Sequence, residues 1–220
     1  MSEVINVKKD GIQFALCEDG TAIVKEGKKS LKGDLVIPPV VEHDDKAYHV
    51  VRVDDMAFMG CSALESITLP EGIHEIGIAA FALCLKLKNI ILPDGVFKIG
   101  GAAFSLCTAL TTVSLPKGLT EIEEKMFTGS LKLGSVTIPG SVAKIKADAF
   151  NGCMSLKWLY FAGDAPELDS TGCESNSLEE CRPKIYYQKG TEGWGETFGG
   201  APTQDFFEDP FISELLKLLN

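Results

Sequence analysis

The side chains in this sequence that are best suited to chemistry are seven cysteines and three histidines. Four of the cysteines share one setting, because each follows a phenylalanine by three residues; they are Cys61, Cys84, Cys107 and Cys153. A metal or redox centre would need partners at short spacing, and the sequence contains neither a Cys-x-x-Cys nor a His-Glu-x-x-His pattern. We therefore interpret the four recurring cysteines as small buried apolar residues.

Other candidates for a catalytic or ligand-binding centre have ordinary structural interpretations. His43, His49 and His74 are expected on the surface. The glycine-rich stretch 189–200 lacks the Lys-Ser/Thr that ends a phosphate-binding loop, and there is no Gly-x-Ser-x-Gly motif. The sequence predicts a protein that is not an enzyme, with no catalytic residue, no metal and no cofactor.

Two further groups of residues leave alternatives open. Glu121, Glu123 and Glu124 are typical of a solvated turn, with a calcium site as a weaker alternative because the Asp-rich loop pattern is missing. Seven cysteines leave at least one unpaired within the chain, and Cys173 and Cys181 could be bridged in an oxidising compartment.

The elements that position these residues follow a strict repeat. Phenylalanine recurs every 23 residues, at Phe58, Phe81, Phe104, Phe127 and Phe150. Further apolar residues follow each of them at constant offsets, and Ser130 takes the cysteine position in one copy. This agreement predicts a solenoid in which each copy is one coil. A single coil has too few apolar residues to fold alone, so like positions must stack on like.

Within a copy, the spacing of apolar residues changes from three to two. Phe81, Cys84 and Leu87 are three residues apart, which indicates tight helical turns. Ile90 and Leu92 are two apart, which indicates a short strand that the following proline ends. Consecutive copies run in the same direction, so these strands are predicted to pair in parallel, one per coil.

The run Leu64-x-x-Ile67-x-Leu69-Pro70-x-x-Ile73-x-x-Ile76, followed by Ala80-Phe81-x-x-Cys84, resembles the BspA-like leucine-rich repeat family. Residues 33–58 are similar to that family's opening repeat, which carries an inserted hairpin, and 156–166 and 185–203 are similar to its closing segment. The resemblance implies an α/β fold: a right-handed leucine-rich-repeat solenoid with a parallel sheet on the concave side and short helical turns on the convex side.

We expect one domain over residues 1–220. It comprises an N-terminal cap with a β-hairpin and a degenerate first repeat (1–57), the 23-residue repeats (58–161), and a C-terminal cap with a terminal helix (162–220). Residues 209–219 are predicted to form that helix, because their apolar residues make one broad stripe. The stripe either covers the end of the solenoid or associates with a second copy.

Composition narrows the class of partner. The formal net charge is −10 and no basic cluster is present, which argues against nucleic acid and anionic membranes as partners. No segment is long and apolar enough to span a membrane. Residues 2–11 lack the apolar stretch of a secretory signal, whereas the family resemblance implies secreted or cell-surface proteins, so the compartment stays open.

The candidate binding site follows from the alternation of side chains along the predicted strands. The residues flanking each buried strand position should share the concave face; they are Ser66, Thr68, Asn89, Ile91, Thr112, Ser114, Ser135, Thr137, Trp158 and Tyr160. The two aromatic residues are either exposed anchors for a ligand or are packed under the closing segment, against Trp194 or Phe198.

The leading prediction is a non-catalytic module for binding or adhesion that takes a protein or glycan ligand on its concave face. The alternative is a structural protein that self-assembles into a homo-oligomer, either through the helix at 209–219 or through an edge of the solenoid.

Overall fold

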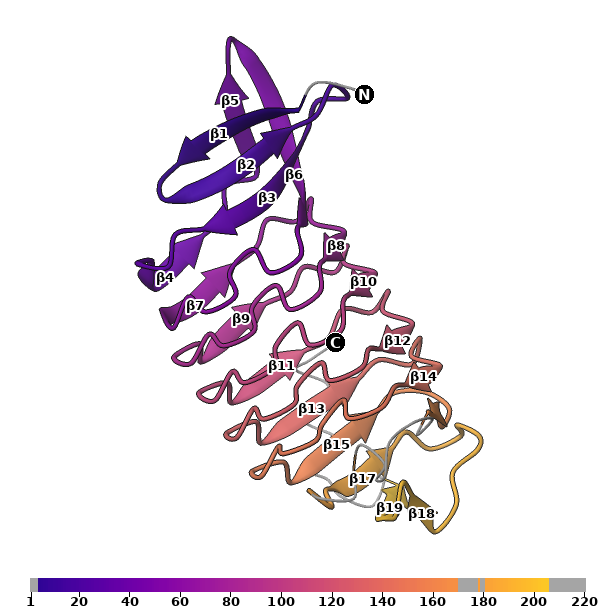
Figure 1. Cartoon of the computed structure of the whole chain (residues 1–220). Coiled ribbons are helices and arrows are strands. Elements are labelled where there is room, and N and C mark those ends of the chain that lie inside the picture. The colour runs from indigo at the N-terminus through magenta and orange to yellow at the C-terminus, as the bar shows by residue number, and fades with distance from the viewer. Residues whose placement is uncertain (1–3, 170–177, 179–180, 206–220) are drawn as a thin grey trace.

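The computed structural model describes residues 4–169, 178 and 181–205 as an elongated stack of coils that follows the order of the sequence (Figure 1). One long strand from each coil lies in a column that we call the main sheet. Its strands are β4 (Lys32–Val36), β7 (Ala63–Thr68), β9 (Asn89–Ile91), β11 (Thr112–Ser114), β13 (Ser135–Ile138), β15 (Trp158–Phe161), β17 (Lys184–Tyr187) and β19 (Ala201–Asp205).

The main sheet confirms the predicted parallel pairing. Strands β4, β7 and β9 form one parallel group, and β11, β13, β15, β17 and β19 form another. Equivalent residues of successive copies lie opposite one another, so Ile67 is paired with Ile90, and Val113 with Val136. β9 and β11 belong to adjacent coils but are not hydrogen-bonded to each other.

A second, shorter strand in each coil was not predicted. These strands are β8 (Glu75–Ile76), β10 (Lys98–Ile99), β12 (Glu121–Ile122), β14 (Lys144–Ile145) and β16 (Glu167–Leu168). They form a parallel ladder beside the main sheet, interrupted between β10 and β12 (Figure 1). β8, β10, β12 and β14 each have a single buried residue and β16 has none, too few to produce an alternating pattern in the sequence.

The N-terminal end of the stack is covered by a mixed sheet. It contains β1 (Ile5–Lys9), β2 (Ile12–Leu16), β3 (Thr21–Gly27), β5 (Val40–His43) and β6 (Lys46–Val53). In this sheet β3 and β6 pair in parallel, and the other neighbouring strands of the cap pair antiparallel. The predicted hairpin is the antiparallel pair β5 and β6, and β6 continues into the short-strand ladder by pairing with β8. At the other end, β18 (Thr197–Phe198) pairs antiparallel with β19.

The predicted helical turns are not helices, and the described residues contain no helix. Six-residue turns take their place, at 55–60, 78–83, 101–106, 124–129 and 147–152. Each turn has two left-handed residues, one two positions before the phenylalanine and one two positions after it, such as Ala102 (φ 55°) and Leu106 (φ 58°). A residue with positive φ interrupts a right-handed helix. The three-residue spacing of apolar side chains in this segment is therefore produced by successive turns and not by a helix.

The five phenylalanines form a continuous stack inside these turns. All five are fully buried, and the ring centroids of neighbouring copies are 5.5 to 5.7 Å apart with planes within 12° of parallel. Such close contact requires identical residues at identical depth in every coil, which accounts for the constant 23-residue spacing.

The cysteine position next to the stack is a hydrogen-bonding position as well as an apolar one. The thiol of Cys107 donates to the carbonyl of Phe81 at 3.2 Å, and that of Cys153 donates to Phe127 at 3.1 Å. Ser130 is also fully buried, and its hydroxyl donates to Phe104 at 2.9 Å. Ser130, the one residue that replaces cysteine at this position, therefore keeps a hydrogen-bond donor there.

Two predictions lie outside the described residues. The terminal helix expected at 209–219 is one of them. The other is the bridge between Cys173 and Cys181, because residue 173 is outside the described ranges. Both stay predictions.

Candidate binding surface

The outward side chains of the main sheet form two parallel rows across the stack. Ser66 is paired with Asn89 in one row, and Thr112 with Ser135 farther along it. Eight predicted site residues in β7, β9, β11 and β13 are exposed or half-buried: Ser66, Thr68, Asn89, Ile91, Thr112, Ser114, Ser135 and Thr137. The fold thus brings these side chains to one face, as the alternation of the strands predicted.

Polar contacts on this face are concentrated in its N-terminal half. The Ser66 hydroxyl donates to the Asp34 carboxylate at 2.5 Å. Beside the rows, the ammonium of Lys88 lies 2.7 Å from the Glu65 carboxylate, and this contact lowers the pKa of Glu65 and raises that of Lys88. Both groups are solvent-exposed, so the pair contributes little to stability.

Apolar side chains are also exposed on this half of the face. Val36 and Ile91 are 67% and 66% exposed, and the strand register places Thr68 directly between them. A β-branched side chain held in solvent on a sheet offers contact area at small cost in side-chain entropy.

The aromatic residues at the other end divide into one exposed and one buried side chain. Trp158 is 39% exposed, and the ammonium of Lys157 lies 5.9 Å from the centre of its ring. Tyr160 is only 8% exposed and stacks on Tyr186 of the next strand at 5.5 Å. The expectation that Tyr160 is an accessible site residue is therefore wrong, because the register pairs it with a second tyrosine.

The closing segment packs on a different aromatic residue from the two that the sequence suggested. Trp194 and Phe198 contact Phe161, with ring centroids 4.9 and 5.4 Å away. Phe161 points into the core, and the Trp194 indole N–H donates to the Gly163 carbonyl at 3.3 Å. Within the described residues, neither Trp194 nor Phe198 makes a ring contact with Trp158, so the indole of Trp158 keeps an accessible surface.

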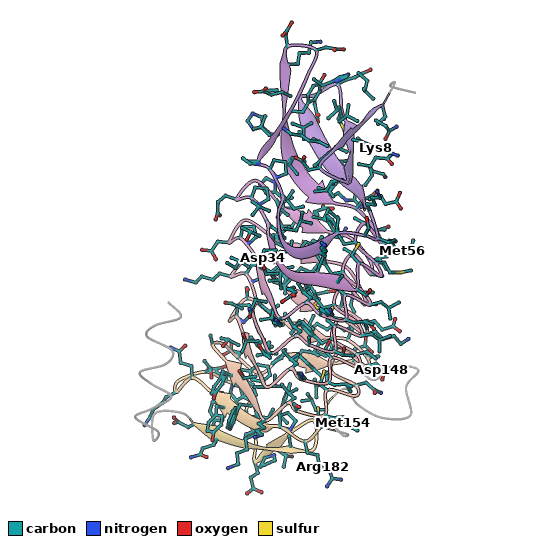
Figure 2. All side chains as sticks on the ribbon, turned by 90° about the vertical axis from the view of Figure 1, so that its left-hand side faces the viewer. Lys8, Asp34, Met56, Asp148, Met154 and Arg182 are labelled. Atoms are coloured by element: carbon teal, nitrogen blue, oxygen red, sulfur yellow. The ribbon has the colours of Figure 1, made fainter. Side chains whose placement is uncertain are left out.

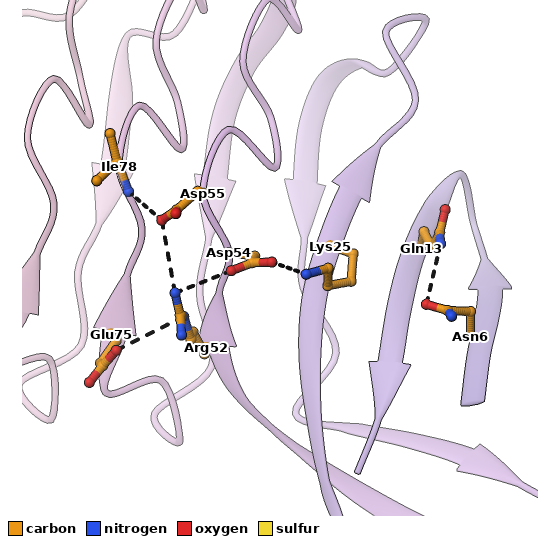
Figure 3. A network of polar contacts seen from close by, with 8 residues as sticks. All are labelled: Asn6, Gln13, Lys25, Arg52, Asp54, Asp55, Glu75 and Ile78. Carbon is orange, nitrogen blue, oxygen red and sulfur yellow. Dashed lines mark hydrogen bonds and ion pairs between the residues drawn. The ribbon is translucent and has the colours of Figure 1, made fainter. Parts of the chain in front are cut away.

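Charged residues join the N-terminal sheet to the first coils (Figure 3). Arg52 lies 3.2 Å from Asp54 and 3.9 Å from Glu75, and Asp54 also pairs with Lys25 of β3. Partial burial opposes ionisation of Asp54, but the bonds from Lys25 and a backbone N–H outweigh it and lower its pKa. The Asp55 carboxylate accepts the Ile78 N–H at 2.8 Å, which ties this network to the next coil.

The short-strand ladder carries side chains of alternating charge. Successive coils present Arg52, Glu75, Lys98, Glu121, Lys144 and Glu167 at equivalent positions. Next to this row, Lys146 lies 2.8 Å from both Glu121 and Glu123, which raises its pKa and lowers that of Glu121. Glu121 and Glu123 of the acidic segment thus form ion pairs with a lysine of the neighbouring coil and are also partly exposed to solvent.

The remaining chemistry-bearing residues do not converge. Burial raises the pKa of Cys107 and Cys153 to about 12, so these thiols stay protonated at neutral pH and lack the thiolate needed for metal binding or nucleophilic attack. Within residues 4–169, 178 and 181–205, no three His, Cys, Asp or Glu side chains are grouped so as to hold a metal ion. None of these residues forms a helix long and apolar enough to cross a membrane.

Comparison with known proteins identifies the family to which the repeats belong. The family model described as the BspA type leucine rich repeat region matches residues 46–157, in six copies. The chain belongs to this family. The BspA type repeat accounts for the coils from β6 to the start of β15, and the two caps lie mostly outside the matched residues.

Solved structures of bacterial leucine-rich repeat proteins are similar to this BspA type chain. The Treponema pallidum leucine rich repeat protein (TpLRR) is 26% identical, with a TM-score of 0.67 over 98% of this chain and 96% of that one. A leucine rich cell surface protein from Faecalibacterium prausnitzii is 26% identical, with a TM-score of 0.64 over 90% of this chain. The present chain spans 58% of that protein's length. No curated protein matches the chain.

Proposed function

We propose that the chain is a non-catalytic binding or adhesion module that takes a protein or glycan ligand on its main-sheet face. The observation that carries this proposal is the pair of outward rows, in which exposed hydroxyl and amide side chains lie between the exposed Ile91 and Trp158. Short polar side chains lose little entropy on binding, and each offers a hydrogen-bonding group. An indole beside them supplies the larger contact typical of a binding hot spot.

The relatives support a role in recognition. The similar protein from Faecalibacterium prausnitzii is described as a cell surface protein, a location at which host molecules and other cells are met. We extend that location to this chain as part of the proposal. We also propose that residues 1–220 act as one domain, with caps at 1–57 and 162–220 around the repeats at 58–161, because an uninterrupted stack offers a ligand one surface.

The proposed ligand sites are Ser66, Thr68, Asn89, Ile91, Thr112, Ser114, Ser135, Thr137 and Trp158. These residues lie on five neighbouring strands, β7 to β15, and β4 continues the face on one side. Six such strands about 4.8 Å apart give a face roughly 25 Å long, enough for a peptide segment or an oligosaccharide. Tyr160 is left out of this set, because its ring is buried against Tyr186.

Binding to immobilised glycans and to extracellular-matrix proteins tests the proposal. For any probe that binds the full chain, Trp158→Ala and Thr112→Glu should each weaken binding about tenfold or more, the usual size of a hot-spot effect. Met154→Ala is the matched control, because Met154 is 73% exposed and lies with Met56 and Asp148 along the side of the turns (Figure 2). Unchanged affinity in both test variants, with a loss in the control, would move the site to the turns.

A further inference from the structure

Both strand ladders are interrupted at the same junction between coils. The main sheet is divided between β9 and β11, and the short-strand ladder between β10 and β12. At the next junction, the N–H groups of Ala143 and Lys146 donate to Thr120 and Ile122, at 2.9 and 2.8 Å. The equivalent N–H groups at the interrupted junction belong to Thr120 and Glu123, and neither has a backbone acceptor in the described part of the chain.

The turn side of the same junction is fully connected. The N–H groups of Ala102, Phe104 and Leu106 donate to carbonyls of the next turn at 2.8, 2.9 and 2.7 Å. Phe104 and Phe127 remain stacked, with their ring centroids 5.6 Å apart, and the Ser130 hydroxyl reaches Phe104 across the junction. Beside the main sheet, the Thr111 N–H still donates to the Lys88 carbonyl at 3.3 Å, so the coils are also joined next to β9 and β11. Two coils that are joined at the turns and beside the main sheet but separated at the short-strand ladder have the geometry of a hinge.

The separated side is an open cleft of about 280 Å³. One wall is formed by Phe97, Lys98 and Ile99, and the other by residues 119–121 and Glu123. Phe97 is 51% exposed at this edge. The carbonyls of Phe97 and Ile99 occupy the positions that accept hydrogen bonds at intact junctions. The acceptors for the N–H groups of Thr120 and Glu123 are therefore present on the opposite wall of the cleft.

The charged side chains across the cleft are complementary. Lys98 and Glu121 hold equivalent positions in β10 and β12, where the ladder alternates in sign. Lys98 has no ion pair within 4 Å among the described residues. Closing the cleft would bring these opposite charges together and would also give Thr120 and Glu123 their backbone acceptors.

We propose that the solenoid bends at this junction, with the phenylalanine stack as the pivot and the cleft between Lys98 and Glu121 as the side that opens and closes. The bend divides the main-sheet face into a plate of β4, β7 and β9 and a plate that begins at β11. Opening changes the angle between the plates, and hence the shape that the face presents to a partner. The bend rests on backbone geometry and stands apart from the proposed binding function.

Amide hydrogen exchange of the full chain, followed by NMR, tests the hinge. Thr120 and Glu123 should have protection factors at least about tenfold lower than Ala143 and Lys146, the same positions one coil later, because only the latter pair are bonded across their junction. Equal protection at the two junctions would overturn the proposal, since a permanently closed stack protects both alike.

A charge reversal tests the closing contact. Lys98→Glu places a like charge opposite Glu121, so it should lower protection at Thr120 and Glu123 about threefold or more and leave Ala143 unchanged. Lys132→Glu is the control, because Lys132 is exposed on a turn away from the cleft and the charge change is identical. An equal effect of both variants, or none from Lys98→Glu, would refute this role of Lys98.

Discussion

Replacing Ser130 separates two interpretations of the ladder of cysteines. If the position requires only a small apolar residue, Ser130→Ala removes a buried hydroxyl and should be neutral or stabilising. The structure predicts the opposite, because the hydroxyl is fully buried and donates to Phe104 at 2.9 Å. Without it, the same carbonyl keeps only the N–H of Cys107 at 3.4 Å, a long and weak bond.

The expected cost of Ser130→Ala is about 1–1.5 kcal/mol of unfolding free energy, the net value of one buried hydrogen bond. For a chain of this length, that corresponds to a fall in Tm of roughly 2–6 °C. Ser130→Cys should stay within about 0.5 kcal/mol of the parent protein, because Cys107 and Cys153 make the same bond one coil away on either side. Urea unfolding of the three proteins measures this, and an alanine variant as stable as the parent would refute the hydrogen-bond interpretation.

Three further predictions concern the coils. Burial raises the pKa of the Cys107 thiol to about 12, above the value near 9 of an unfolded thiol. The stabilisation from burying the neutral thiol is therefore complete below pH 9, and this thiol lowers the free energy of unfolding by about 1.4 kcal/mol per pH unit as the pH rises above 9. Cys107→Ser should make the free energy of unfolding fall less between pH 8 and pH 10, as measured by urea unfolding. Lys146→Met leaves Glu121 and Glu123 unpaired and should cost about 0.5–1 kcal/mol at low salt and less in 1 M NaCl; a salt-independent loss would contradict the ion-pair explanation. Gly60 has φ 74° with open space around it, so Gly60→Ala should destabilise by about 0.5–1 kcal/mol through backbone strain alone, and a more stable variant would show that the turn relaxes.

The features that depend on repetition could be predicted from the sequence. A constant interval between Phe81 and Phe104 can be satisfied only by stacking like on like, and the rings do stack. The alternation around Ile67 and Val136 likewise located the strands and the face on which Ser66 and Thr137 lie.

Other features depend on contacts that the repeat pattern does not encode. Three-residue spacing fits both a helix and a chain of turns, and the positive φ of residues such as Leu106 decides for turns. Alternation assigns Tyr160 to the outward side of β15, but only the register of β17 shows that Tyr186 covers it. The N–H of Glu123 loses its acceptor through the relative position of two coils, for which one copy's sequence contains no signal.

The alternating charges of the short-strand ladder have a consequence for how such a chain can lengthen or shorten. The signs repeat every second coil, whereas the phenylalanine rings are the same in every coil. Excising a single 23-residue copy would leave the rings matched but would set two glutamates, such as Glu75 and Glu121, on adjacent rungs. Excising 46 residues would restore opposite neighbours, so copies of this repeat should be gained and lost most easily in pairs.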